Sequence, residues 1–127
     1  MRAIDTNILI RLLIEDDPPQ TKIAEAFVER GAFVGLLVLA ETVWVLRSGY
    51  GATQKRIVET IEMLLSHDSL ALEEPETVAS ALKLFSENPR TDFADCLILE
   101  AARKSANLPL GTFDRALAKL PGAELVS

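Results

Sequence analysis

Five acidic side chains stand at positions where a folded chain could bring them together. Asp5 directly follows a short apolar stretch that predicts a strand, and Asp114 follows another. Glu41 lies within a long apolar segment, and Asp92 and Asp95 precede a further one. Asp92 and Asp95 are three residues apart, so a helix would place them on neighbouring positions of one face. Carboxylates grouped without bases repel one another, and a divalent cation relieves that repulsion.

Each acid also has an ordinary structural explanation. Asp is a favoured N-cap, so Asp5 could simply cap the helix that follows it. Asp92 and Asp95 could compensate a helix dipole, although the apolar neighbours of Asp95 make this explanation weaker there. Glu41 could pair with Arg47 or another base, contact a helix dipole, or lie on a helix face that reaches water. The chemical interpretation therefore depends on the acids occurring as a set.

Alternating strand and helix patterns predict how the acids are positioned. Short strands are expected at about 3–4, 32–35, 70–72, 108–111 and 124–126. Helices are expected at about 8–14, 19–29, 37–48, 54–66, 75–86, 92–106 and 115–120. This order predicts an α/β fold with a short parallel central sheet flanked by helices on both faces. The strand ends and the first helical turns that carry the five acids would then meet at the carboxyl edge of the sheet.

Neighbouring residues refine this expectation. Thr6 and Asn7 are expected to cap the first helix, which would leave the Asp5 carboxylate free. His67, the only histidine, follows a helix and is expected to be a cap or a surface residue, and Cys96 is expected to be a small core residue. Oxygen ligands without histidine or cysteine favour Mg²⁺ or Mn²⁺, and carboxylate-held divalent metal serves mainly phosphoryl chemistry.

The bulk properties limit the class of protein. The 127 residues suit one domain, and a hydrophobic fraction of 49% predicts a globular chain with a substantial core. A single cysteine excludes an internal disulfide and suits the reducing cytoplasm. No apolar run is long enough for a membrane span, and the N-terminus lacks the pattern of a secretion signal. The formal charge of −6 argues against a general electrostatic nucleic-acid binder, but not against an enzyme that recruits phosphate through metal ions.

The acids occur within an ordered set of motifs. These are Met-x-x-Ile-Asp-Thr-Asn at residues 1–7, Glu41 in its apolar helix, Asp-Phe-Ala-Asp-Cys-Leu-Ile-Leu-Glu-Ala-Ala at 92–102 and Thr-Phe-Asp at 112–114. Taken together, they resemble a PIN-domain nuclease, and within that superfamily the VapC toxins of prokaryotic toxin–antitoxin pairs. The resemblance spans nearly the whole chain and implies a single PIN domain over residues 1–127. Cys96 and Glu100 stand where small residues are common, which concerns packing more than catalysis.

The resemblance implies a metal-dependent endoribonuclease with an acidic quartet. The quartet would be Asp5, Glu41, Asp95 and Asp114, with Mg²⁺ or Mn²⁺ as the cofactor. Asp5 and Asp95 would be the firmest ligands. Glu41 and Asp114 would complete the shell of the ion or hold its water. The role of Asp92 stays open between a part in the site and a helix cap.

Other residues and partners follow from the same resemblance. Thr6, Asn7 and Thr112 would orient water or substrate, and Arg115 would contact phosphate or form an ion pair. Toxins of this kind act on RNA, usually dimerise, and are blocked by a VapB-like antitoxin through a basic segment. The acidic charge of this chain suits such a partner.

Two other functional classes explain less of the sequence. An aspartyl-phosphate phosphatase needs a second acid two residues after its nucleophile, but position 7 is Asn and the usual lysine is not evident. A non-catalytic acidic α/β interaction or signalling module could use Asp5 with a metal ion. In that class, Glu41 inside an apolar helix would have no role.

Overall fold

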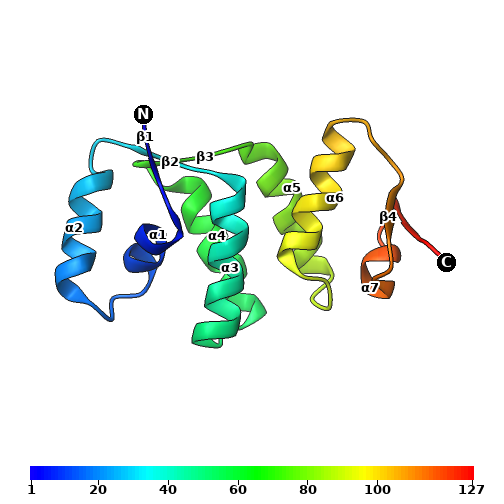
Figure 1. Ribbon diagram of the computed structural model, residues 1–127, viewed down its shortest axis with the longest axis horizontal. Coiled ribbons are helices and arrows are strands. Elements are labelled where there is room, and N and C mark those ends of the chain that lie inside the picture. The colour runs from blue at the N-terminus through cyan, green and yellow to red at the C-terminus, as the bar shows by residue number, and fades with distance from the viewer. The chain divides into compact units, whose positions relative to one another are not determined.

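The computed structural model describes all 127 residues as a mixed α/β protein with seven helices and five short strands (Figure 1). The chain divides into two compact units, Met1–Pro75 and Glu76–Ser127. None of the seven helices has both the length and the apolar character that a bilayer crossing requires.

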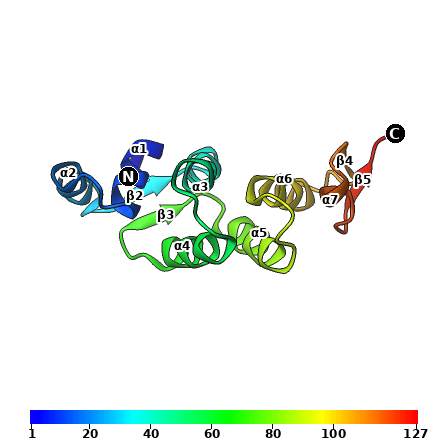
Figure 2. The same ribbon diagram turned by 90° about the horizontal axis from the view of Figure 1, so that it is seen from below.

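The first unit is a three-stranded parallel sheet with four helices. Its elements are β1 (Arg2–Ile4), α1 (Thr6–Leu13), α2 (Pro18–Val28), β2 (Ala32–Val34), α3 (Leu36–Tyr50), α4 (Gln54–Ser66) and β3 (Leu70–Leu72). The strand order is β1-β2-β3, and the register aligns Ile4 with Val34 and Val34 with Leu72. The three strands therefore end at the same level. Helix α1 packs between α2 and α3, as both views show (Figures 1 and 2).

Aliphatic side chains hold this unit together. Leu9 of α1, Leu39 of α3, and Ile57 and Ile61 of α4 are at most 1% exposed, and Val34 of β2 is buried with them. Each such side chain contributes roughly 1.5–3 kcal/mol on burial. Aromatic residues make up only 6% of the sequence, so the core consists mainly of aliphatic side chains. Their helical spacing explains why those segments form helices.

The helix boundaries of the first unit follow local signals in the sequence. Asp17 caps α2 by accepting a hydrogen bond from the Gln20 amide at 3.2 Å, and Thr53 caps α4 by accepting one from the Arg56 amide at 3.1 Å. Helix α3 ends at Gly51, whose φ of +64° is a conformation that favours glycine. Asp and Thr are favoured N-caps and glycine is a favoured C-terminal residue, so the residue types at these positions explain where the helices begin and end.

The second unit carries the remaining elements. They are α5 (Pro75–Glu87, starting at the boundary), α6 (Phe93–Lys104), β4 (Leu110–Thr112), α7 (Arg115–Ala118) and β5 (Ala123–Leu125). The rings of Phe85 and Phe93 pack edge to face with centroids 5.8 Å apart, which joins the end of α5 to the start of α6. Leu99, Leu117 and Leu120 form a buried cluster that joins α6 to α7.

The strands pair in two sheets, whereas the alternation of elements suggested one. Strands β4 and β5 form a separate parallel pair, with Leu110 opposite Ala123. Only the short helix α7 separates them in sequence, so their pairing closes a small loop at low entropic cost. Strand β4 also starts at Leu110 rather than at the expected residue 108. Pro109 has no amide hydrogen to donate, and pairing begins where the Leu110 amide donates to the Gly122 carbonyl at 2.8 Å.

Candidate functional site

The end of β1 places Asp5 directly at the N-terminus of α1. Asp5 has an extended backbone (φ −95°, ψ −179°), and its Oδ1 accepts a hydrogen bond from the Ile8 amide at 3.1 Å. Asp5 is therefore the N-cap, and the prediction that Thr6 or Asn7 caps this helix is wrong. Thr6 is already the first helical residue and is buried, so it does not occupy the capping position. The second carboxylate oxygen of Asp5, Oδ2, lies outside this hydrogen bond.

A cleft of about 250 Å³ opens beside Asp5. It is lined by residues of the β1–α1 junction and of the first two turns of α3, namely Asp5, Thr6, Asn7, Leu37, Val38 and Glu41. The structure thus brings Asp5 and Glu41, 36 residues apart in the sequence, to one cleft within the first unit. The two polar neighbours predicted to orient water or substrate, Thr6 and Asn7, line the same cleft.

Glu41 is exposed, so among the explanations that the sequence left open, a helix face that reaches water is the one that the structure supports. Only one face of α3 is buried, and it carries Leu39, Thr42, Val43 and Leu46. The opposite face reaches water although it carries Leu37, which is 87% exposed, and Trp44, which is 68% exposed. Because both faces of α3 carry apolar residues, the sequence alone did not show which face is buried. Glu41 therefore needs no buried partner, and its carboxylate is accessible at the cleft.

Glu73 is a polar residue of this edge that the sequence interpretation missed. It follows β3 in register with Gly35 and Asp5, which follow the other two strands. Its Oε1 accepts a hydrogen bond from the Leu36 amide at 2.8 Å, at the start of α3. Gly35, the N-cap residue of α3, has no side chain to do this. The sequence did contain a signal for Glu73. It directly follows the strand predicted at 70–72, just as Asp5 directly follows the first predicted strand.

The second unit positions the other acids at helix N-termini. Asp92 is the N-cap residue of α6 without a capping hydrogen bond from its side chain, and Asp95 is half-buried in the first turn. Asp114 caps α7, where its Oδ1 accepts from the Leu117 amide at 2.9 Å. The hydroxyl oxygen of Thr112 accepts from the Asp114 amide at 2.9 Å and so orients the turn between β4 and α7. Arg115 is exposed as the first residue of α7.

The electrostatics of this unit show that its acids act on one another. Burial raises the pKa of Asp95, and the negative charges of Asp92 and Asp114 raise it further. Burial also raises the pKa of the neighbouring Cys96 thiol to about 12, with added contributions from Asp95, Glu100 and Asp92. Cys96 is fully buried and remains a neutral core residue, as predicted.

The donor set fits a hard divalent cation. The side chains at both units' candidate positions are carboxylates, an amide and hydroxyls, which are the oxygen ligands that Mg²⁺ and Mn²⁺ prefer. His67 is exposed at the end of α4, where its Nδ1 accepts from the Ser69 amide at 3.1 Å. Neither unit by itself groups three or more metal-binding side chains. A bound cation would nevertheless counter the effects that raise the pKa of Asp95, namely burial and the negative charges of Asp92 and Asp114.

Comparisons with known proteins identify the family of this chain and one relative. The family model described as PIN domain matches residues 3–123. The matched range includes Asp5, Glu41, Asp95 and Asp114. A VapC ribonuclease of Aquifex aeolicus (strain VF5) is 29% identical over 125 residues, covering 94% of this chain and 92% of that protein. No solved structure matches the chain significantly.

Proposed function

The chain belongs to the PIN domain family, and from that premise we propose that it is a ribonuclease that uses a divalent metal ion, Mg²⁺ or Mn²⁺. The observation that carries the proposal is the cleft that Asp5 and Glu41 line together with Thr6 and Asn7. The similarity to a VapC ribonuclease over 94% of the chain supports RNA as the substrate. The acidic residues of the second unit supply the remaining candidate ligands.

In this proposal the candidate ligands of the ion are the acids Asp5, Glu41, Asp95 and Asp114. When bound, a divalent cation supplies the positive charge that makes water a better nucleophile and stabilises the charge that develops on the phosphate. The carboxylates would hold that charge, and the hydrogen bond from the Ile8 amide fixes the Asp5 carboxylate at the N-terminus of α1. Water attacks phosphorus, one phosphorus–oxygen bond forms and another breaks, and no covalent enzyme intermediate arises.

The polar neighbours position the reactants. Thr6 and Asn7 orient water or the ribose-phosphate at the cleft that they line. Thr112 acts indirectly, because its contact with the Asp114 amide sets the turn that carries the Asp114 carboxylate. Arg115 is exposed for contact with a phosphate, and the charge of Asp92 acts on Asp95.

The biological setting that we propose is a toxin–antitoxin pair in the cytoplasm. The toxin is a homodimer of single PIN domains, its substrate is RNA, and its partner is a VapB-like antitoxin. A basic segment of the antitoxin would neutralise the acids and exclude substrate. The formal charge of −6 on this chain supports attraction to a basic protein.

Cleavage of a labelled single-stranded RNA pool tests the proposal. The full chain should cut RNA with MgCl₂ or MnCl₂ and stop when EDTA is added. Asp5→Asn and Glu41→Gln should each lower the rate by on the order of 10²-fold or more. Glu62→Gln, at an exposed glutamate of α4, is the matched control and should cut normally. Absence of cleavage with either metal, or normal cleavage by Asp5→Asn, refutes the proposal.

The exposure of Glu41 favours one alternative, a non-catalytic acidic α/β interaction or signalling module. An exposed glutamate on a helix needs no metal to explain it. The two functions differ in the behaviour of Glu41→Gln. If this variant folds and binds metal like the parent protein, and neither protein cuts RNA, the interaction module is the better description.

A further inference from the structure

A second hollow of the first unit adjoins the acidic cleft. It lies between α1 and α2, has a volume of about 240 Å³, and is lined by Asn7, Ile8, Arg11, Gln20 and Ile23. We call it the α1–α2 groove. Asn7 lines both this groove and the acidic cleft. An extended chain of nucleotides with its phosphate at the cleft therefore has a path into the groove.

The walls of the α1–α2 groove suit a flat, partly apolar group. Ile8 is half-buried, and Ile23 of α2 is 68% exposed although it faces the hollow. The volume is below the range of about 300–1,000 Å³ that holds drug-sized ligands. A single nucleobase has the right character, because its face is apolar and its edge carries hydrogen-bonding groups.

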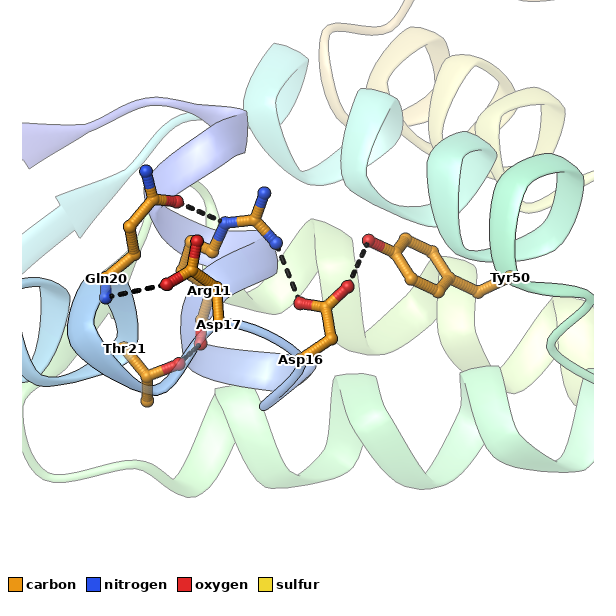
Figure 3. A network of polar contacts seen from close by, with 6 residues as sticks. All are labelled: Arg11, Asp16, Asp17, Gln20, Thr21 and Tyr50. Atoms are coloured by element: carbon orange, nitrogen blue, oxygen red, sulfur yellow. Dashed lines mark hydrogen bonds and ion pairs between the residues drawn. The ribbon is translucent and has the colours of Figure 1, made fainter.

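Arg11 is held in a fixed orientation at this groove (Figure 3). Its Nε donates to Gln20 Oε1 at 2.7 Å, and its Nη1 donates to Asp16 Oδ1 at 2.8 Å. The Thr21 hydroxyl donates to the Arg11 carbonyl at 3.0 Å, which ties α2 to α1 at the same residue. The Nη2 hydrogens of Arg11 lie outside these contacts. They are donors whose direction is already set before a ligand binds.

The charges near Arg11 determine whether its free Nη2 donors favour a charged or a neutral ligand. Asp16 balances the guanidinium charge at 2.8 Å, and its side chain is itself 50% exposed. Tyr50 of α3 also donates to Asp16, through a longer contact of 3.4 Å. A phosphate would meet the repulsion of Asp16, whereas the neutral edge of a base would not. Guanine presents the acceptors O6 and N7 at this edge, whereas adenine presents its N6 donor in place of O6. The hydrogens of Arg11 Nη2 therefore favour guanine.

We propose that the α1–α2 groove is a guanine subsite for the nucleotide next to the cleaved phosphate, with Arg11 as its specificity-determining residue. The subsite rests on the proposed function, because it reads the RNA that the acidic cleft cuts. The isoleucines cover the face of the base, and Arg11 donates to its edge.

Binding without cleavage tests the subsite first. Labelled uridine octanucleotides with one central guanosine or one central adenosine are titrated against the full chain in EDTA, and fluorescence anisotropy gives the two affinities. We expect the guanosine RNA to bind about tenfold more tightly. Arg11→Lys keeps the charge but lacks the Nε and Nη1 atoms through which Gln20 and Asp16 fix the direction of the free donor. It should therefore remove the discrimination. Ile23→Ala should weaken binding of both RNAs.

Matched controls separate the groove from general effects. Arg30→Lys changes another exposed arginine just beyond α2, and Ile98→Ala changes another exposed isoleucine, on α6. Both should bind as the parent protein does. Circular dichroism melts confirm that all four variants fold. Equal affinity of the parent protein for the two RNAs, or undiminished discrimination in Arg11→Lys, overturns the subsite.

A cleavage experiment distinguishes failure of the subsite from failure of the proposed function. Sequencing of the ends cut from a randomised RNA pool with Mg²⁺ should show guanine enriched at one position beside the cut, and Arg11→Lys should lose this enrichment. Cutting without any base preference leaves the ribonuclease in place and overturns the subsite. No cutting, with guanosine discrimination intact in EDTA, overturns the ribonuclease and supports the groove as a guanine-binding site. A groove that binds a basic partner protein and shows no base discrimination is a protein interface, which also overturns the subsite.

Discussion

Glu73 accepts a hydrogen bond of 2.8 Å from the backbone amide of Leu36, the first residue of α3. The two residues are 37 positions apart in the sequence. Gly35 offers no side chain to this helix end, so an acid from the end of the neighbouring strand β3 takes the place of a local cap. The negative charge at the N-terminus also suits the helix dipole. Because α3 carries Glu41, Glu73 is a positioning residue for the acidic cleft.

Replacing Glu73 with alanine should destabilise the start of α3. We expect the free energy of unfolding to fall by about 0.5–2 kcal/mol, the usual cost of losing an N-cap. Urea titration followed by circular dichroism measures this change. Glu73→Gln retains an acceptor oxygen and should recover most of the stability, whereas Glu62→Ala on an exposed face of α4 should have little effect. Equal stability of Glu73→Ala and the parent protein contradicts the capping role.

Asp95→Asn should raise the stability of the metal-free protein at pH 7. Since the folded state raises the pKa of Asp95 above 3.8, it holds the proton more tightly than the unfolded chain does. Folding stability from this group is therefore fully present below about pH 3.8 and is lost as pH rises through the higher folded-state pKa. Asparagine does not titrate, so the variant does not lose this stability as the pH rises. Thermal melts in EDTA between pH 3 and 7 should show the difference in Tm growing with pH, and a constant difference contradicts the expectation.

Cys96 should resist thiol reagents in the folded protein. Its side chain is buried and its pKa is raised to about 12, so almost no thiolate is present at pH 8. Iodoacetamide followed by mass spectrometry should show one modification in urea and almost none in buffer. Because the unfolded thiol titrates near pH 9, the folded state should also lose stability above that pH. Rapid labelling of the native protein contradicts this prediction.

Thr42→Val should stabilise the protein, and Thr60→Val should not. Both threonines are buried in helices, but the Thr42 hydroxyl has no hydrogen-bond partner, whereas the Thr60 hydroxyl donates to the Arg56 carbonyl at 2.8 Å. Valine has nearly the same shape and removes the hydroxyl. We expect a gain of about 1 kcal/mol at position 42 and a loss of about 1 kcal/mol at position 60. Urea titrations of both variants measure the contrast, and equal effects contradict it.

Local signals in the sequence predicted most elements within two or three residues. Helices α2 and α4 begin within one residue of the expected positions, and the strands β2 and β3 lie at the expected ranges. These signals involve residues only three or four apart, so a single sequence contains them. The same local reasoning was wrong at the start of α1, because Asp, Thr and Asn at positions 5–7 are all acceptable caps and only the backbone conformation selects one.

The sequence by itself determined the α/β class, the set of acids and their oxygen-only chemistry, because residue types and short-range periodicity are sufficient for these. The tertiary structure decided that Glu41 is exposed, that Asp5 and Glu41 share a cleft, and that Glu73 caps the helix that carries Glu41. It also decided that β4 pairs with β5 in a separate sheet. These relationships depend on strand pairing, register and helix orientation. Packing over long sequence separations sets them, and no local pattern encodes them.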